Sequence, residues 1–193
     1  GDKILESILP EVTEVERLRK LTFLETRAIK VPTVAPDDLR RFAALIKVGA
    51  LGATQLAKRL KLSNKQAQRL KALTINTPLT SPALSPEARR KQLYQLGSDL
   101  VRDLVLLAWA DELLTEPRRS SARTDQWVML LKEVDDWKPI SFPLRGKDVL
   151  EMGIEPSQKV GEILQAIESW WEAENFMPDR EACLKRLSEL TAN

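Results

Sequence analysis

Apolar residues recur at intervals of three and four along most of the chain, and no segment shows the alternation typical of a half-buried strand. This periodicity predicts helices at about 10–28, 37–46, 53–60, 63–73, 86–96, 99–116, 127–134, 160–173 and 179–190. The expected fold class is therefore all-α. An irregular multi-helix array over 1–139, called the body, is followed by a small C-terminal helical tail over 140–193.

Cap and turn residues set the expected helix ends. Asp37 or Asp38, and Ser63, stand where a side-chain oxygen can accept a hydrogen bond from a free backbone N–H at a helix start. Gly49 and Gly52 are expected to break the chain between two helices. Residues 1–9 are interpreted as the cut end of a longer helix.

The segment Asp99–Glu116 is apolar on nearly every side. A helix of this kind lies at the centre of a bundle. Arg102 and Asp103 fall inside the segment, and a buried charge needs a partner of opposite sign. We therefore expect both side chains to form ion pairs with neighbouring helices.

The net charge of +2 conceals an uneven distribution. No aspartate or glutamate occurs between Arg40 and Pro86, whereas the segment 140–193 holds six basic and ten acidic residues. A basic region of this kind suits a polyanion, although solvated helix faces produce the same composition. The basic residues of the stretch are Arg40, Arg41, Lys47, Lys58, Arg59, Lys61, Lys65, Arg69 and Lys71.

Composition excludes most enzyme classes. With no histidine and a single cysteine, Cys183, the chain cannot use histidine catalysis, an internal disulfide or a cysteine-based zinc site. The adjacent Asp135 and Asp136 diverge on a helix and do not form a metal site unaided. No apolar run reaches the roughly 20 residues of a membrane span, and no signal peptide is evident. The chain alone is therefore expected to be no enzyme, to hold no cofactor or metal, and to be cytoplasmic.

The stretch from Phe142 to Gly161 contains two expected helix starts. Asp148 is expected to cap a first turn over 149–152, and Pro156 with Ser157 to begin a second helix. Free N–H groups at helix starts, with Lys147 and Lys159 close by, suit a phosphate, although a corner that only packs has the same pattern.

Several segments carry a family resemblance. Pro143-Leu-Arg-Gly-Lys-Asp-Val-Leu-Glu-Met-Gly-Ile-Glu-Pro156, followed by Val160-Gly-Glu-Ile-Leu164, resembles the C-terminal tail of bacterial class II tRNA nucleotidyltransferases. These are the CCA-adding enzymes, which share a family with bacterial poly(A) polymerases. The Leu60-Lys-Leu-Ser-Asn64 turn and the segment Tyr94-Gln-Leu-Gly-Ser-Asp-Leu-Val-Arg-Asp-Leu-Val-Leu-Leu107 resemble the body of the same family. The chain departs from the family at Ser157, where a glycine is usual in the turn.

The resemblance implies a C-terminal fragment that holds tRNA, or another RNA 3′ end, for its own N-terminal catalytic domain. That domain would carry a Gly-Ser turn, an Asp-x-Asp pair for magnesium and a region selecting CTP and ATP, none of which occurs in these residues. The body would lie along the acceptor stem and the tail would reach the tRNA elbow. The RNA-binding candidates are Lys58, Arg59, Lys61, Asn64, Lys65, Arg69, Arg145, Gly146, Lys147 and Lys159.

Two other functions stay open at this point. Residues 53–70 also resemble a helix-turn-helix of a DNA-binding protein, a pattern that a plain helical hairpin reproduces. A helical module that binds a protein partner is the third possibility. Neither CCA addition nor poly(A) addition is favoured, because the residues that decide it belong to the catalytic domain.

Overall fold

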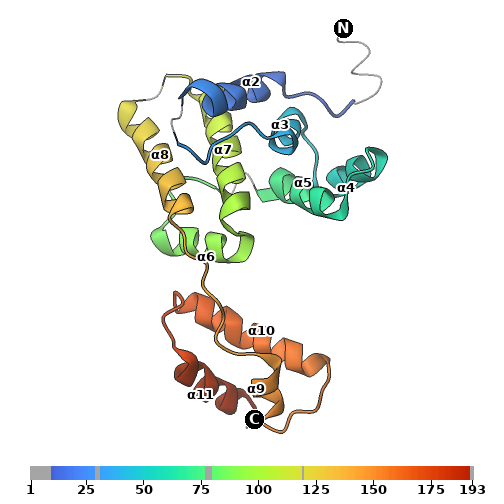
Figure 1. Cartoon of the computed structure of the whole chain (residues 1–193), viewed down its shortest axis with the longest axis vertical. Helices are drawn as coiled ribbons and strands as arrows, with labels where there is room; N and C mark the ends of the chain where they lie inside the picture. Colours follow the sequence, from blue (N-terminus) through green and yellow to red (C-terminus); the bar gives the residue numbers. More distant parts are fainter. Residues whose placement is uncertain (1–9, 29–30, 77–79, 119, 192–193) are drawn as a thin grey trace. The chain divides into compact units, whose positions relative to one another are not determined.

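The computed structural model describes residues 10–28, 31–76, 80–118 and 120–191, and within them every regular element is helical (Figure 1). The one strand-like feature among these residues is an isolated antiparallel bridge between Val12 and Ile46. The predicted all-α class is confirmed. The expected helix end at residues 1–9 lies outside the described residues.

The chain forms two compact units. The first runs up to Ser85 and resumes over Gln95–Trp137, and the second combines Pro86–Tyr94 with the chain from Lys138 onward. The predicted boundary between a body at 1–139 and a tail at 140–193 stays a prediction, because compactness alone does not show that a unit folds independently.

The first unit is built around one buried helix. Its elements are α2 (Val15–Phe23), the π-helical turn η1 (Leu24–Ala28), α3 (Asp38–Leu45), α4 (Ala50–Arg59), α5 (Asn64–Asn76), α7 (Ser98–Thr115) and α8 (Ser121–Asp135). In α7 every residue from Asp103 to Ala110 is buried, as its apolar sequence predicted. Helices α7 and α8 lie side by side (Figure 1), and Trp109 stacks on Trp127 with ring centroids 5.8 Å apart.

The caps expected at Asp37 and Ser63 are present, whereas one expected break is absent. Asp37 accepts a hydrogen bond from the Arg40 N–H at 2.7 Å. Ser63 Oγ accepts one from the Gln66 N–H at 3.3 Å. The prediction that Gly52 breaks a helix was wrong, because Gly52 lies inside α4. A Cβ at this position would lie 2.9 Å from the Val48 Cβ, so the glycine serves close packing there.

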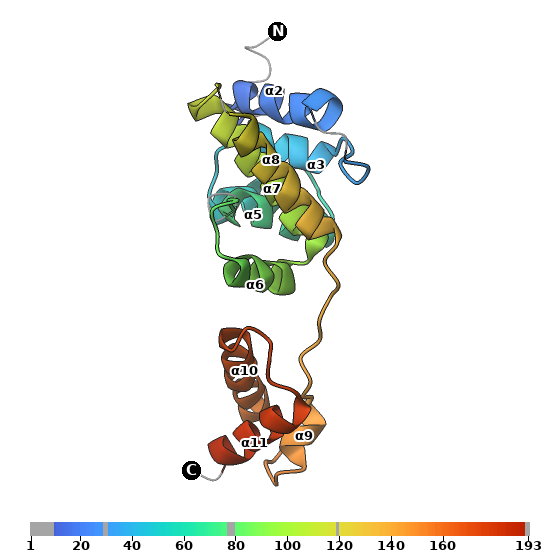
Figure 2. The same ribbon diagram turned by 90° about the vertical axis from the view of Figure 1, so that its left-hand side faces the viewer.

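The second unit consists of α9 (Gly146–Leu150), α10 (Gln158–Ala173) and α11 (Arg180–Thr191), with residues 86–94 of α6 (Pro86–Leu96). Helices α10 and α11 and the short α9 enclose its core (Figure 2). Ile167, Trp171, Cys183 and Leu187 are the buried centre of that core. Trp171 is 4% exposed, and its Nε1–H donates to the Pro178 carbonyl at 2.8 Å.

Helix α6 joins this core through an aromatic side chain that the sequence did not single out. Tyr94 contacts Trp171 edge-on, at 5.6 Å between ring centroids, and lies 5.0 Å from Phe176. Its hydroxyl donates to Glu168, while Lys91 pairs with Glu172 at 3.1 Å. Burial, with the nearby Glu168 carboxylate, raises the pKa of the Tyr94 hydroxyl, so the phenol stays protonated and keeps donating.

Candidate nucleic-acid interface

The corner between α4 and α5 carries a group of exposed polar side chains. Lys58 lies in the last turn of α4, Lys61 in the connecting turn, and Asn64 and Lys65 at the start of α5. Lys61 adopts a left-handed conformation with φ of 53°, which turns the chain between the two helices. The sequence-predicted residues of this corner therefore do come together on one exposed edge.

The lysines of the corner keep their charges available. Within the part of the chain that the structure describes, Lys58, Lys61 and Lys65 form no ion pair. Arg59 differs, because its Nη2 lies 2.6 Å from the Glu11 Oε2 and this hydrogen bond lowers the pKa of the Glu11 carboxyl. Arg59 is thus a partly neutralised cation, and the three lysines are the cations most accessible to a polyanion.

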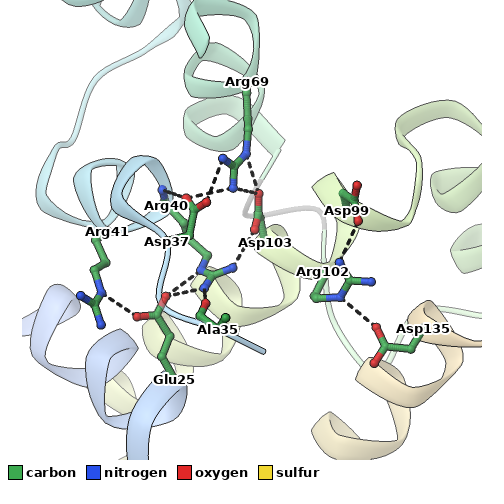
Figure 3. Close-up of polar contacts among 10 residues, drawn as sticks. All are labelled: Glu25, Ala35, Asp37, Arg40, Arg41, Arg69, Asp99, Arg102, Asp103 and Asp135. Atoms are coloured by element: carbon green, nitrogen blue, oxygen red, sulfur yellow. Dashed lines mark hydrogen bonds and ion pairs between the residues drawn. The ribbon is translucent and has the colours of Figure 1, made fainter. Parts of the chain in front are cut away.

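Other arginines of the basic stretch point into a buried ion network (Figure 3). Arg41 pairs with Glu25 at 2.7 Å, and Glu25 also receives Arg40 at 2.5 Å. Arg40 continues to Asp103 at 2.8 Å. The acidic partners come from outside the stretch 40–86, so its composition overstated the free positive charge.

Arg69, one of the predicted RNA-binding residues, closes this network. Its guanidinium lies 2.6 Å from Asp103 and 2.9 Å from Asp37. Burial opposes ionisation of Asp37, but hydrogen bonds from the Arg40 N–H and Arg69 outweigh it and lower the pKa of the Asp37 carboxyl. Arg69 therefore has two carboxylate partners inside the fold, which makes it a positioning group more than an exposed contact.

The turn before α9 is organised by a carboxylate. The prediction that Asp148 caps a helix over 149–152 was wrong, because α9 begins at Gly146 and Asp148 is its third residue. From there its carboxylate accepts the Arg145 N–H at 2.6 Å and pairs with Arg180 at 2.5 Å. Asp148 is buried, so a negative charge of the protein already occupies this helix start.

The three cations of the tail that were predicted to bind RNA form no ion pairs among the described residues. Arg145 and Lys147 are exposed at the start of α9, and Lys159 is exposed in the first turn of α10. A Cβ at Gly146 would lie 3.8 Å from Val160 Cγ1, an ordinary contact. The fold itself does not require glycine at 146.

The Asp148–Arg180 pair makes a testable contribution to the tail. The hydrogen bond from Arg180, then that from the Arg145 N–H, lowers the pKa of the Asp148 carboxyl. Asp148→Asn is expected to destabilise the second unit by about 1–3 kcal/mol at pH 7. The difference should be full above pH ~4 and vanish as the pH falls through the lowered pKa, because the wild-type carboxylate is then protonated.

Hydrogen exchange of α9 and α11 amides between pH 3 and 7 measures this difference. Glu189→Gln is the matched control, since Glu189 pairs with Arg186 at 3.3 Å and both side chains are about half exposed. A pH-independent Asp148→Asn effect, or one no larger than that of Glu189→Gln, contradicts the assignment.

Sequence reasoning missed one cation near the predicted corner. Arg102 was expected to pair within the bundle, and it does bind Asp135 at 2.8 Å. Its side chain also lines a polar cavity of about 390 Å³ together with Lys65 and Arg69. The spacing Asp99-x-x-Arg102 at the start of α7 was the available signal, because residues three apart share a helix face.

No group of three or more cysteine, aspartate or glutamate side chains among the described residues is placed to hold a metal ion. None of the described helices combines the length and apolar character needed to cross a membrane.

Comparison with known proteins finds similarity to a tRNA nucleotidyltransferase over part of the chain. Over 140 residues, 68% of the chain, it is 32% identical to the A-adding tRNA nucleotidyltransferase of Deinococcus radiodurans, of which the match covers 32%. It is also 37% identical over 73 residues, 38% of the chain, to an uncharacterized 28 kDa protein in the petA 5′ region of Rhodospirillum rubrum, of which the match covers 29%. No protein-family model matches the chain.

The chain thus spans about a third of the length of these curated relatives. The resemblance read from the sequence is confirmed at the level of a relationship to the tRNA nucleotidyltransferases.

Proposed function

We propose that the chain is the RNA-holding region of a tRNA nucleotidyltransferase that adds A, or CCA, to RNA 3′ ends. The similarity to the A-adding enzyme over 68% of the chain carries this proposal. The exposed lysines at the α4–α5 corner support it, because RNA phosphates are bound chiefly by cations without carboxylate partners. A class II enzyme acting in the cytoplasm is the finer form of the proposal.

The chain would bind the RNA and position its 3′ end. Its own N-terminal catalytic domain would carry out the reaction. That domain would bind magnesium and CTP or ATP. The body would hold the acceptor stem through Lys58, Arg59, Lys61, Asn64 and Lys65, with Arg69 positioning the start of α5. The tail would contact the elbow through Arg145, Gly146, Lys147 and Lys159. Binding of this kind reads phosphates and A-form shape more than bases.

The salt dependence of tRNA binding tests the proposal. We expect the 193-residue chain to bind an unmodified tRNA transcript more tightly than a random DNA duplex. The pair Lys58→Gln with Lys61→Gln should reduce the slope of log K against log salt by about 1.4–1.8, because each lost phosphate contact removes ~0.7–0.9. Fluorescence anisotropy at several salt concentrations gives both quantities.

Lys132→Gln with Lys185→Gln is the matched control, because it removes the same charge from exposed positions on α8 and α11. Arg145→Gln with Lys147→Gln repeats the measurement for the tail. Preference for the duplex would favour a helix-turn-helix DNA-binding protein, and absence of binding to either polyanion would favour a protein-interaction module. A slope change in the control as large as in the corner pair would contradict the assignment of this surface.

A further inference from the structure

The polar cavity at the start of α7 lies within the first unit, beside the α4–α5 corner. Its charged lining comes from α3, α5 and α7 and the residue before α3, and its cations outnumber its anions. The charged lining residues are Asp37, Arg40, Lys65, Arg69, Asp99, Arg102 and Asp103. Arg40 and Arg69 are each bound to two buried or partly buried carboxylates of the ion network. The cations left to receive a ligand are Lys65, which forms no ion pair among the described residues, and Arg102, one of whose two carboxylate partners is fully exposed.

Arg102 forms ion pairs with two carboxylates, a shielded one from Asp135 and an exposed one from Asp99 (Figure 3). Its Nε donates to Asp135 at 2.8 Å, and that pair is largely shielded, with side chains 16% and 18% exposed. Its Nη1 donates to Asp99 at 2.9 Å, but the Asp99 side chain is 96% exposed. The Nη2 group donates to none of the described residues.

The two aspartates therefore bind Arg102 with different strengths. An ion pair with a fully solvated partner stabilises a protein by only about 0–1 kcal/mol, so a better anion can displace Asp99. The shielded Asp135 keeps the guanidinium oriented while this happens. Lys65, which is exposed and forms no ion pair among the described residues, supplies the second cation to the same cavity.

We propose that this cavity binds one phosphate group of the RNA backbone between Arg102 and Lys65. When RNA is absent, Asp99 forms an ion pair with the Arg102 guanidinium in place of the phosphate. The inference rests on the proposed function and extends it, because it assigns a phosphate contact to Arg102 and a competing role to Asp99. A phosphate fits this arrangement, since its oxygens accept several N–H donors of a planar guanidinium at once, whereas lysine adds a point charge.

The competing role predicts a gain of binding. Asp99→Asn is expected to tighten tRNA binding by about two- to fivefold at low salt, because the competing carboxylate is gone. Asp125→Asn is the matched control, since Asp125 is an exposed aspartate early in α8. It changes the net charge equally and should alter affinity by less than about 1.5-fold. Lys65→Gln should weaken binding and remove the gain from Asp99→Asn when the two are combined.

A second measurement uses inorganic phosphate as the probe and follows the Arg102 Nε–H resonance by NMR. Phosphate should shift this resonance at lower concentration in Asp99→Asn than in the wild type. If tRNA binds but Asp99→Asn gains no more than Asp125→Asn, the phosphate cavity is wrong and the proposed function stands. If tRNA does not bind while phosphate still shifts Arg102, the proposed function is wrong and the anion cavity stands. If neither probe responds, both fail.

Discussion

Asp103→Asn is expected to destabilise the first unit by about 3–5 kcal/mol, the cost of removing one partner from a buried ion network. Asp103 is 4% exposed and accepts from Arg40 at 2.8 Å and from Arg69 at 2.6 Å. Asparagine removes the negative charge and, because Arg40 and Arg69 bind different carboxylate oxygens, places its NH2 donor group against one of the two guanidinium groups. Arg40, itself 3% exposed, is then left with a single carboxylate partner, Glu25.

Hydrogen exchange of α3, α5 and α7 amides in increasing urea measures this loss. The matched control is Asp111→Asn in the same helix, since Asp111 also pairs with an arginine, Arg17, at 2.6 Å. The Asp111 side chain is 44% exposed, so its loss should cost no more than about 1 kcal/mol. Equal destabilisation by the two variants would show that the network around Asp103 stabilises no more than a surface pair.

The contrast between these aspartates shows what the sequence could indicate. Periodicity identified α7 as buried, and burial alone required Asp103 and Arg102 to find partners. The partners of Asp103, which are Arg40 and Arg69, lie 63 and 34 residues away along the chain. The partner of Arg102, Asp135, lies 33 residues away. The pattern of apolar and polar residues along one helix does not indicate which distant helix packs against it. The partners in the ion network could therefore be identified only from the structure.

The same limit explains the basic stretch. Counting charges along the sequence made Arg40, Arg41 and Arg69 equal to the lysines, because no acidic residue lies between Arg40 and Pro86. Folding brings Glu25, Asp37 and Asp103 to the arginines and leaves Lys58, Lys61 and Lys65 exposed. The free positive charge of the basic stretch is therefore smaller than the sequence indicated, and the exposed lysines of the α4–α5 corner contribute to it.

Helix α6 is the second feature beyond the reach of sequence pattern. Its apolar face predicted a helix over 86–96, and this is confirmed. An amphipathic pattern does not indicate which other helix the apolar face packs against. Chain order placed α6 with the helices on either side of it. Tyr94 instead packs with Trp171 and Phe176, whose positions are more than 70 residues away along the chain.

Trp171→Ala is therefore expected to unfold α6 together with the tail. Trp171 is 4% exposed and packs against Tyr94, Phe142 and Phe176 with ring centroids 5.1–5.6 Å apart. Truncating a buried tryptophan costs about 3–5 kcal/mol, which is most of the stability a unit of this size can have. Hydrogen exchange should show lost protection in α6, α10 and α11, with α7 and α8 unchanged.

The reciprocal variant is Trp109→Ala, which removes the partner stacked on Trp127 in the first unit. It should lower the free energy of opening measured by hydrogen exchange in α7 and α8 by a similar amount. The amides of α10 and α11 should stay protected. The behaviour of α6 separates the two possible assignments, because α6 follows whichever core its side chains complete. If α6 loses protection in Trp109→Ala and keeps it in Trp171→Ala, then Tyr94 and Lys91 do not bind α6 to the tail, and the tail folds without this helix.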